Sequence, residues 1–490
     1  MLIDHRWFFT LCLVLIGPAP TIYAKSTGDP QLVNAIDALL KRQAVKSSSA
    51  SILLVHLDDD RVLYAHQPDL KLHPASNTKL MTTAVALQQL GPTYRWQTQL
   101  AADKFEGGTA QNLYFIGQGD PYFVSESLWK LVDDARFNGL KIVTGDLVID
   151  DTRFSGPVVA PGFDDKDQDS AYRAASGAAS INFNAVVIRI RPAKKSGQTP
   201  QVDVRPDSGY IEVVNRATTT RRGKERLKLR ASAFEDRTKI VLEGTIPMRH
   251  AGLTVRRRID RPTMYLGMAL KLFLKNAGID VKGKIRTGKV ISRPRRLARL
   301  RSRNLADVIS VVNKTSNNFM AEHLVLTLGA EKGRAGNWTE GNRVVSNYLK
   351  QVIGLSDFKY VNGSGLFGDT RFSARDFVQV LAYMSKMSPE LTVYENSLAV
   401  SGVDGTLRRR LKALKPRTVR GKTGTLNGVI CLSGYLTFAD GSRGAFSLLM
   451  NDLKGAPWSV WPIHDKIIQT FSAFKPTLAT TKKTKATPVP

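Results

Sequence analysis

Three short motifs combine serine, lysine and small residues in a way that could support nucleophilic catalysis. In the first, Ser76-Asn-Thr-Lys79, the serine and the lysine are three residues apart. Side chains at this spacing lie on the same face of a helix, so the lysine could take the proton of the serine hydroxyl. A lysine acts as a base only when burial or a nearby cation lowers its pKa. A second cation is therefore required near Lys79.

The second and third motifs supply candidates for these partners. Lys422 lies in RGKTGTLNGV, on a predicted strand where Gly421 and Gly424 permit close backbone approach. Ser316 and Asn318 belong to the tripeptide SNN, which directly precedes a predicted helix. Alone, SNN is typical of a helix cap and KTG of a turn. In the order S-x-x-K, S-x-N and K-T-G, the three are the motif set of β-lactamases and penicillin-binding proteins.

Two further S-x-x-K copies occur, at 127–130 (SLWK) and 356–359 (SDFK). The first lies early in an amphipathic helix and the second in a predicted loop. Only Ser76 opens a predicted buried helix, with Pro74 near its first turn and Gly91 after its last. A helix N-terminus offers unpaired N–H groups that could hold a developing oxyanion. Position in the fold thus favours Ser76 as the nucleophile.

Several other kinds of site are excluded by their missing residues. The seven histidines are scattered and no H-E-x-x-H occurs, so no metal site and no cofactor are expected. No G-x-S-x-G occurs, which argues against an α/β-hydrolase elbow. Two near-matches to a P-loop, at 278–285 and 283–290, lack the Ser or Thr that binds magnesium. We expect both to join strands.

The N-terminus predicts export. Residues 1–24 have a polar start with an arginine, a short apolar run and a Gly-Pro break, which predicts a signal peptide cleaved after Ala24. Its ten apolar residues are too few to span a bilayer. Cys12 lies within this segment, which leaves Cys431 without a disulfide partner. These features predict an exported protein of the bacterial periplasm.

The composition is that of a folded protein with a very basic surface. The 490 residues fit two or three domains, and the net charge is +29. Such a surface attracts polyanions, namely nucleic acid, anionic lipid or an anionic wall polymer. Because export separates the chain from nucleic acid, we expect no nucleic-acid partner. Peripheral contact with anionic envelope polymers or the membrane is the favoured use of the charge.

The order of elements predicts one α/β domain with a large insertion. Residues 99–295 alternate short apolar runs with Gly, Pro and Asp turns, which predicts a β-rich region. Helices and strands are predicted on both sides of it: a helix at 30–44, a hairpin at 49–67, helices across 304–400, strands across 417–452 and a helix at 461–474. Both ends of the chain would then build the domain that carries the insertion.

With further segments, the chain resembles the low-molecular-mass class C penicillin-binding proteins, which are serine D-alanyl-D-alanine carboxypeptidases and endopeptidases. These segments include FIGQGDPYF at 115–123, TGDLVIDDTRF at 144–154, NGSGLFGDTRFS at 362–373 and GVDGTLRRRL at 402–411. The resemblance implies an α/β (α+β) penicillin-binding/β-lactamase-like transpeptidase domain with two inserted β-rich domains. The predicted division is a signal peptide at 1–24, a catalytic domain at 25–98 and 296–475, inserted domain II at 99–188 and 260–295, inserted domain III at 189–259, and a disordered basic tail at 476–490.

The resemblance also implies roles for the catalytic residues. Ser76 would attack the carbonyl of the penultimate D-alanine and form an acyl-enzyme, while Lys79 takes its proton. Ser316 would relay a proton towards the leaving amine. Asn318 would hydrogen-bond the substrate backbone or Lys79, and Lys422 would supply positive potential.

Substrate-binding roles follow for the strand of the third motif. Thr423 and Thr425 would bind the terminal carboxylate, Gly424 would allow close approach, and the backbone N–H groups of Ser76 and Thr425 would form the oxyanion hole. Asp150, or its neighbour Asp151, aligns with an acidic residue that faces the amino group of the stem peptide in related enzymes. Asn427 would lie in the same pocket.

One position departs from the family pattern. Family members often read GSGLSR where this chain has GSGLFG, so Gly368 replaces an arginine expected to bind the side-chain carboxylate of the stem peptide. Arg371, three residues on, is a candidate substitute.

The leading hypothesis is a carboxypeptidase that acts on peptidoglycan stem peptides, extends to D,D-crosslinks and binds β-lactam antibiotics covalently. A β-lactamase or esterase of the same fold is one alternative, although it needs an efficient deacylating base that the sequence does not reveal. A non-catalytic, basic wall-binding protein is another.

Overall fold

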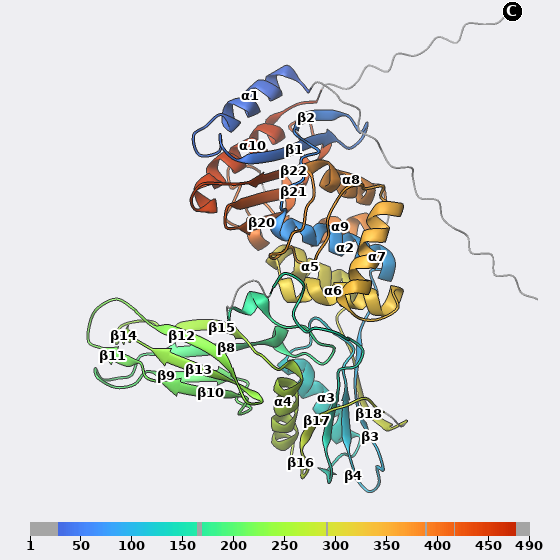
Figure 1. Cartoon of the computed structure of the whole chain (residues 1–490), viewed down its shortest axis with the longest axis vertical. Helices are drawn as coiled ribbons and strands as arrows, with labels where there is room; N and C mark the ends of the chain where they lie inside the picture. The colour runs from blue at the N-terminus through green and yellow to red at the C-terminus, as the bar shows by residue number, and fades with distance from the viewer. Residues whose placement is uncertain (1–27, 164–168, 291–292, 388–389, 416, 477–490) are drawn as a thin grey trace, which may run out of the picture.

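The structure is a computed structural model that describes residues 28–163, 169–290, 293–387, 390–415 and 417–476. The predicted signal peptide and all but the first residue of the predicted tail lie outside these residues. In this described part of the chain, no helix is both long and apolar enough to cross a membrane. Figure 1 shows an α/β unit built from both ends of the chain, with two β-rich units below it.

A six-stranded antiparallel sheet forms the centre of the α/β unit. The N-terminal hairpin joins the C-terminal strands through β1, whose residues Ser49–His56 pair along β22 from Asn451 to Gly444. The sheet order is β19 (Ala399–Val400), β20 (Val419–Leu426), β21 (Val429–Thr437), β22 (Arg443–Asn451), β1 (Ser49–His56), β2 (Val62–His66). Strands from both ends of the chain thus lie in one sheet.

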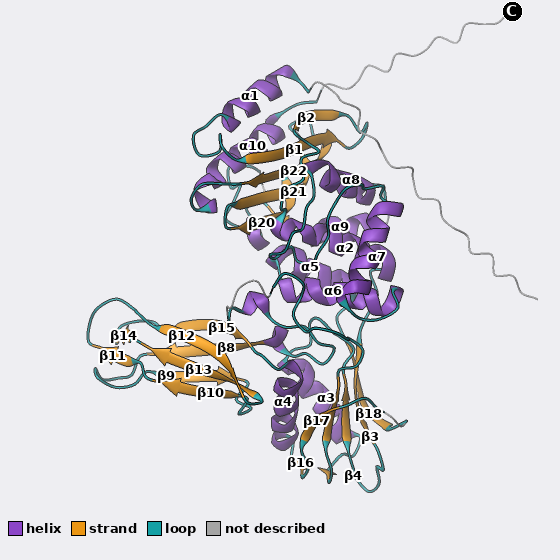
Figure 2. Ribbon diagram, viewed as in Figure 1, coloured by secondary structure: helices purple, strands orange, loops and turns teal. Residues whose placement is uncertain are grey.

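Helices cover both faces of this sheet (Figure 2). The side chains of β1 pack into two hydrophobic cores, one on each face of the sheet, because successive side chains of a strand point to opposite faces. Ile52 and Leu54 pack with α1 and α10, whereas Leu53 and Val55 pack with the larger helical layer. The helices are α1 (Pro30–Leu40) and α10 (Trp461–Ala473) on one face, and α2 (Thr78–Leu90), α5 (Leu305–Thr315), α6 (Asn318–Lys332), α7 (Trp338–Gln351), α8 (Ala374–Ser385) and α9 (Glu390–Ser397) in the other layer.

Helix α2 lies at the centre of the larger layer. A 3-10 turn, Ala75–Asn77, leads into it and places Ser76 directly before its first turn. Residues Thr78 to Leu87 are all buried, as expected for a helix enclosed on every side. Gly91 ends the helix with a φ of 77°, which glycine adopts without strain. The predicted helix start and stop are confirmed.

A mixed five-stranded sheet and two helices form the second unit. Its strand order is β17 (Ile285–Thr287), β7 (Leu147–Asp150), β5 (Leu113–Ile116), β3 (Gln97–Ala102), β18 (Arg295–Arg301). The remaining elements are α3 (Ser125–Phe137), α4 (Pro262–Asn276) and a small sheet of β16 (Asp280–Val281), β6 (Ile142–Val143) and β4 (Thr109–Ala110). The P-loop-like segments fall on β16, β17 and their connections, as predicted.

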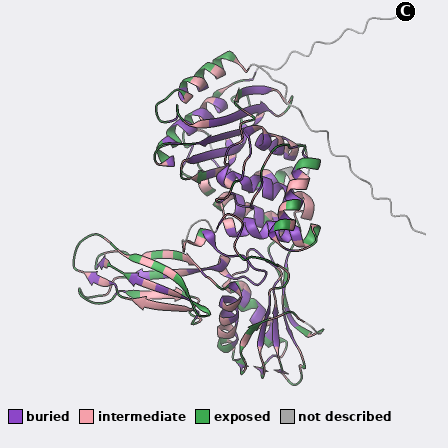
Figure 3. Cartoon of the chain, viewed as in Figure 1, coloured by how far each residue is buried: buried purple, intermediate pink, exposed green. Residues whose placement is uncertain are grey.

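Three small sheets form the third unit. The first has the order β15 (Leu253–Arg258), β8 (Ala185–Arg191), β9 (Gln201–Arg205), and the second β10 (Ile211–Asn215), β13 (Arg237–Glu243), β12 (Lys228–Phe234). The third pairs β11 (Thr218–Thr220) with β14 (Thr245–Pro247). Figure 3 shows many exposed residues on this unit, in contrast to the buried central sheet of the α/β unit.

Three predicted domain edges fall inside strands. The edge at 98/99 cuts β3, the edge at 295/296 separates Arg295 from the rest of β18, and the edge at 188/189 cuts β8. Strands β3 and β18 pair with each other in the second unit, and β8 pairs along β9 and β15 in the third. Since strand pairing joins residues far apart in sequence, composition alone could not locate these edges. We propose domain edges in the connections that flank these strands.

Candidate active site

The first motif forms a serine–lysine pair at the head of α2. Lys79 is fully buried, while Ser76 is partly exposed. Lys79 Nζ lies 2.8 Å from Ser76 Oγ, 2.7 Å from Asn318 Oδ1 and 2.8 Å from the Ser364 carbonyl oxygen. The last two oxygens can only accept hydrogen bonds. A neutral Lys79 therefore donates its two N–H groups to them and directs its lone pair at the Ser76 hydroxyl.

The surroundings of Lys79 favour this neutral form. Burial lowers its pKa well below the usual value, and the charge of Lys422 lowers it further, whereas Glu322 opposes the shift. Burial also lowers the pKa of Lys422 to about 7. The second cation that the sequence required is thus present and acts on Lys79 in the expected direction.

The second motif lies between α5 and α6. Ser316 ends α5 in the left-handed region, with a φ of 59°. Asn317 caps α6 by accepting a hydrogen bond from the Met320 N–H at 3.0 Å. Asn318, the first residue of α6, accepts from Lys79 and donates through Nδ2 to the Tyr172 carbonyl oxygen at 3.0 Å. The cap and the catalytic candidates are therefore different residues of the same tripeptide.

The third motif, on β20, closes the group. Lys422 Nζ donates to Ser316 Oγ at 2.9 Å and to the Thr423 carbonyl oxygen at 2.6 Å. A Cβ atom on Gly424 would stand 2.6 Å from the Pro74 carbonyl oxygen, so only glycine lets β20 lie this close to the Ser76 turn. Five predicted catalytic residues, Ser76, Lys79, Ser316, Asn318 and Lys422, thus meet in one place.

Two supporting residues had no role assigned from the sequence. Glu322 on α6 is buried and accepts hydrogen bonds from the backbone N–H groups of Gly363 and Ser364, both at 2.9 Å. Burial raises its pKa, while these bonds and Lys79 oppose the shift. Ser364 in turn presents its carbonyl to Lys79. The segment NGSG was noted as part of the resemblance, but nothing in the sequence linked it to a glutamate 41 residues earlier.

The predicted substrate-binding residues of β20 lie along the strand beyond Lys422. Thr423 Oγ1 donates to Thr406 Oγ1 at 2.9 Å, and Thr425 is exposed. Asn427 is exposed in the turn between β20 and β21, where it lines a hollow of 670 Å³ with Trp458. Binding of a substrate carboxylate by the threonines remains a prediction.

Asp150 lies apart from these residues. One of its carboxylate oxygens accepts hydrogen bonds from Thr152, and the other from the Val290 N–H at 2.9 Å. Neighbouring Asp151 accepts from the Ala179 N–H, and burial raises its pKa to about 6. Within the described residues, Asp150 makes no hydrogen bond or ion pair to the three motifs and does not line the hollow of Asn427. Its substrate-binding role remains a prediction.

The position that departs from the family pattern is tightly packed. Gly368 has a φ of 66°, and its carbonyl oxygen lies 3.2 Å from His73 Nε2. A Cβ atom there would meet Val361 at 3.1 Å. Arg371, the candidate substitute, forms an ion pair with Asp369 at 2.8 Å.

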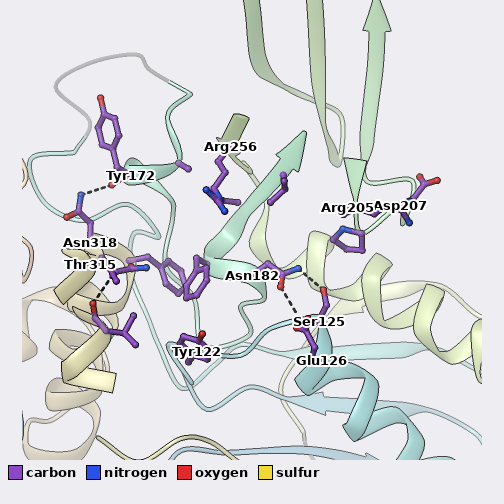
Figure 4. Close-up of a pocket in the computed structure, with 18 of the residues that line it drawn as sticks. Tyr122, Ser125, Glu126, Tyr172, Asn182, Arg205, Asp207, Arg256, Thr315 and Asn318 are labelled. Carbon is purple, nitrogen blue, oxygen red and sulfur yellow. Dashed lines mark hydrogen bonds between the residues drawn. The ribbon is translucent and has the colours of Figure 1, made fainter. Parts of the chain in front are cut away.

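A cleft of 1190 Å³ opens beside Ser316 and Asn318, between the α/β unit and the other two units (Figure 4). Its catalytic end is formed by α5 and α6, and its far wall by β8, β9 and β15. The lining residues that matter below are Tyr122, Glu126, Asn182, Phe183, Val187, Arg205, Asp207, Arg256 and Phe319.

Comparisons with known proteins show the family and the fold of the chain. A family model described as the D-Ala-D-Ala carboxypeptidase 3 (S13) family matches residues 32–459. The D-alanyl-D-alanine carboxypeptidase of Actinomadura sp. (strain R39) is 31% identical over 92% of this chain and 87% of that protein. The D-alanyl-D-alanine carboxypeptidase DacB of Haemophilus influenzae is 23% identical over 86% of this chain and 89% of its own. The crystal structure of penicillin binding protein 4 (dacB) from Haemophilus influenzae has a TM-score of 0.78 at 22% identity, covering 90% of this chain and 99% of that one, which shows a shared fold.

Proposed function

We propose that this chain cleaves the terminal D-alanyl-D-alanine bond of peptidoglycan stem peptides through an acyl-enzyme on Ser76. The chain belongs to the D-Ala-D-Ala carboxypeptidase 3 (S13) family, whose members are serine hydrolases. The observation that carries the proposal is the environment of Lys79. Its two partners other than Ser76 can only accept, so the lysine faces the serine as a base.

Acylation follows from this geometry. Ser76 Oγ attacks the carbonyl carbon of the penultimate D-alanine, and Lys79 Nζ takes the hydroxyl proton. The C–N bond then breaks as the proton held by Lys79 passes through Ser316, which lies next to Lys422, to the leaving nitrogen, so that Lys79 is neutral again. D-Alanine departs and the shortened peptide remains as an ester on Ser76.

Deacylation uses the same base in reverse. Water attacks the ester carbonyl, Lys79 takes its proton, and the Ser76 oxygen recovers a proton as the peptide leaves. A β-lactam would acylate the same hydroxyl, but its leaving nitrogen stays tethered to the adduct. We therefore expect covalent inhibition by β-lactams.

The β-lactamase alternative needs a base that activates water rapidly. Glu322 is the buried carboxylate whose charge acts on Lys79, but both of its oxygens accept backbone N–H groups of the 363–364 segment. It is therefore not placed to activate water. Slow turnover of a chromogenic cephalosporin is expected, and rapid hydrolysis would favour the alternative.

Labelling with fluorescent penicillin tests the nucleophile. Wild-type protein should be labelled and should release D-alanine from a D-alanyl-D-alanine peptide, whereas Ser76→Ala should do neither. Ser127→Ala, at the first position of the other helical S-x-x-K copy, is a matched control and should behave as wild type. Equal labelling of wild type and Ser76→Ala would refute the acyl-enzyme, and an unlabelled wild type would favour the non-catalytic alternative.

The proposal extends to crosslinks and to location. A D,D-crosslink presents the same D-alanyl carbonyl, so we expect endopeptidase cleavage as well. We also propose export to the periplasm and salt-sensitive association of the basic surface with anionic envelope polymers. Cell fractionation tests the first, and sedimentation with isolated sacculi at increasing salt tests the second.

A further inference from the structure

The cleft between the three units is larger than the proposed reaction requires. Its volume of 1190 Å³ exceeds the roughly 300–1,000 Å³ typical of a small-molecule site. A terminal D-alanyl-D-alanine fragment needs only the space beside Ser76 and β20. Since the cleft begins at Ser316 and Asn318, a ligand lying in it would be continuous with the reacting bond.

The floor of the cleft is built from aromatic rings held in fixed positions. Phe183 packs edge-on against Tyr122 of the second unit at 5.6 Å between ring centroids and against Phe319 of α6 at 6.0 Å. Asn182, Phe183 and Asn184 all have positive φ, between 48° and 59°. Consecutive non-glycine residues in this region are strained, and such strain collects at binding sites. Asn182 is further fixed by its hydrogen bonds with Ser125, visible in Figure 4.

The far wall of the cleft carries arginines on one face of a sheet. Arg256 on β15 and Arg205 on β9 both pair in register with Val187 on β8, so the three side chains share a face. Arg189, two residues along β8, continues this face and is exposed. Arg205 forms an ion pair with Asp203 at 3.0 Å, but both side chains are exposed enough for the pair to be weak.

Acidic and amide groups complete the lining. Glu126 and Asp207 lie in the same cleft as the arginines, so its wall offers sites for both signs of charge. In Figure 4, Arg205, Asp207 and Arg256 stand across the cleft from Asn318. A ligand with several carboxylates, amide bonds and an ammonium group would match this set, because arginine binds carboxylates with its planar guanidinium group.

We propose that this cleft binds a second stem peptide, the one crosslinked to the peptide being cleaved. The inference rests on the proposed function, because only a D,D-crosslinked substrate joins a second peptide to the bond at Ser76. Arg205 and Arg256 bind its carboxylates, and the Tyr122–Phe183–Phe319 row supports its backbone. The cleft thus makes a crosslinked dimer a better substrate than a free pentapeptide.

Charge reversal on the far wall tests the proposal. The R205E/R256E double variant should raise KM for a crosslinked muropeptide dimer about tenfold or more. Its kcat/KM for an acetylated D-alanyl-D-alanine tripeptide, and its labelling by fluorescent penicillin, should stay within about twofold of wild type. R221E/R222E, the same charge change in the exposed turn after β11, is the matched control and should leave both substrates unaffected. Binding of the dimer to Ser76→Ala, with and without R205E/R256E, gives a readout independent of turnover.

Each outcome bears on one of the two proposals. Equal loss of dimer cleavage in the two double variants would show a general charge effect and overturn the second-peptide site, as would unchanged dimer affinity in R205E/R256E. Competition with the dimer by peptide-free glycan strands would make the occupant a glycan and also overturn it. A wild-type enzyme that releases D-alanine but does not favour the dimer overturns the site and leaves the proposed function intact. Failure of wild type to release D-alanine overturns the proposed function itself.

Discussion

Replacing Glu322 by glutamine tests whether a buried carboxylate positions the catalytic lysine. Glu322 accepts two backbone N–H groups at 2.9 Å, and the segment it holds presents the Ser364 carbonyl to Lys79 at 2.8 Å. Glutamine has one acceptor oxygen and one NH₂ group. The change therefore removes one charge-assisted bond and leaves one buried N–H facing another donor.

The expected loss of stability is about 2–4 kcal/mol, since a hydrogen bond to a charged group contributes roughly 1.5–3 kcal/mol and an unsatisfied buried donor costs about 1–3 kcal/mol. For a domain of about 250 residues, each kcal/mol shifts the melting temperature by roughly 2–4 °C, so the expected decrease is roughly 4–16 °C. Glu331→Gln, on the same helix but exposed and paired with Arg153, is the matched control and should melt close to wild type.

Penicillin acylation measured against pH supplies a second, independent readout. The negative charge of Glu322 raises the pKa of Lys79, so removing it lowers that pKa. The acidic limb of the acylation profile should move to lower pH, even as the maximal rate falls because Ser364 is less well held. A merely structural glutamate would lower stability and rate without moving the limb. Wild-type stability in Glu322→Gln, or a limb shifted to higher pH, would refute the reasoning.

Three further predictions concern the site and its support. Because the pKa of Lys422 is about 7, kcat/KM for a D-alanyl-D-alanine peptide should fall as pH rises through 7. The corresponding fall in kcat should occur at higher pH, because the carboxylate of the bound substrate stabilises the charged lysine. Identical midpoints for the two profiles would contradict this. Burial lowers the pKa of His323 to about 4, so as the pH falls the unfolded state binds a proton on this histidine before the folded state does. The free energy of unfolding should therefore fall by about 3 kcal/mol between pH 6.5 and 4. Urea titrations should show this decrease for wild type but not for His323→Gln. Gly424→Ala should slow acylation about tenfold or more, because its Cβ would lie 2.6 Å from the Pro74 carbonyl oxygen. Gly288→Ala is the control and should not slow acylation, since its Cβ would have no contact under 3.4 Å. Equal acylation rates in the two variants would show that β20 can shift without cost.

The residues proposed as catalytic could be brought together from the sequence because each lies in a short motif that few other structures share. Ser76 and Lys79 share a helix face, and the requirement for a second cation pointed to Lys422. Glu322 could not be found in this way. Helix α6 is buried on all sides from Phe319 to Gly329, so this part has no exposed polar face against which a functional glutamate would stand out. Its partners, Gly363 and Ser364, reach it only through tertiary packing.

The sequence predicted where several strands lie, but it did not predict which strands pair with one another. The strands β5 and β7 were visible as short, continuous apolar runs that are buried on both faces, and β8 was visible because polar and apolar residues alternate along its second half. Pairing of β3 with β18 joins residues 193 to 204 positions apart, which no local pattern reports. The assignment of Asp150 likewise depended on a motif, whereas the direction of its side chain depends on the contacts with Thr152 and Val290.

The pairing of β1 with β22 has a consequence for when activity can arise. A ribosome working at about 5–20 residues per second makes β22 roughly 20–80 s after β1. In the part of the chain that the structure describes, the strands between 97 and 301 form sheets with one another, so the two β-rich units can fold during that interval. Helix α2 packs against α5 to α9, which are made before the last strands, but the 3-10 turn that holds Ser76 packs against β20 and β21 and must wait for them. We therefore expect a nascent chain to be inactive until nearly its whole length has been made, because Ser76, the proposed nucleophile, is made early and meets Lys422 only at the end.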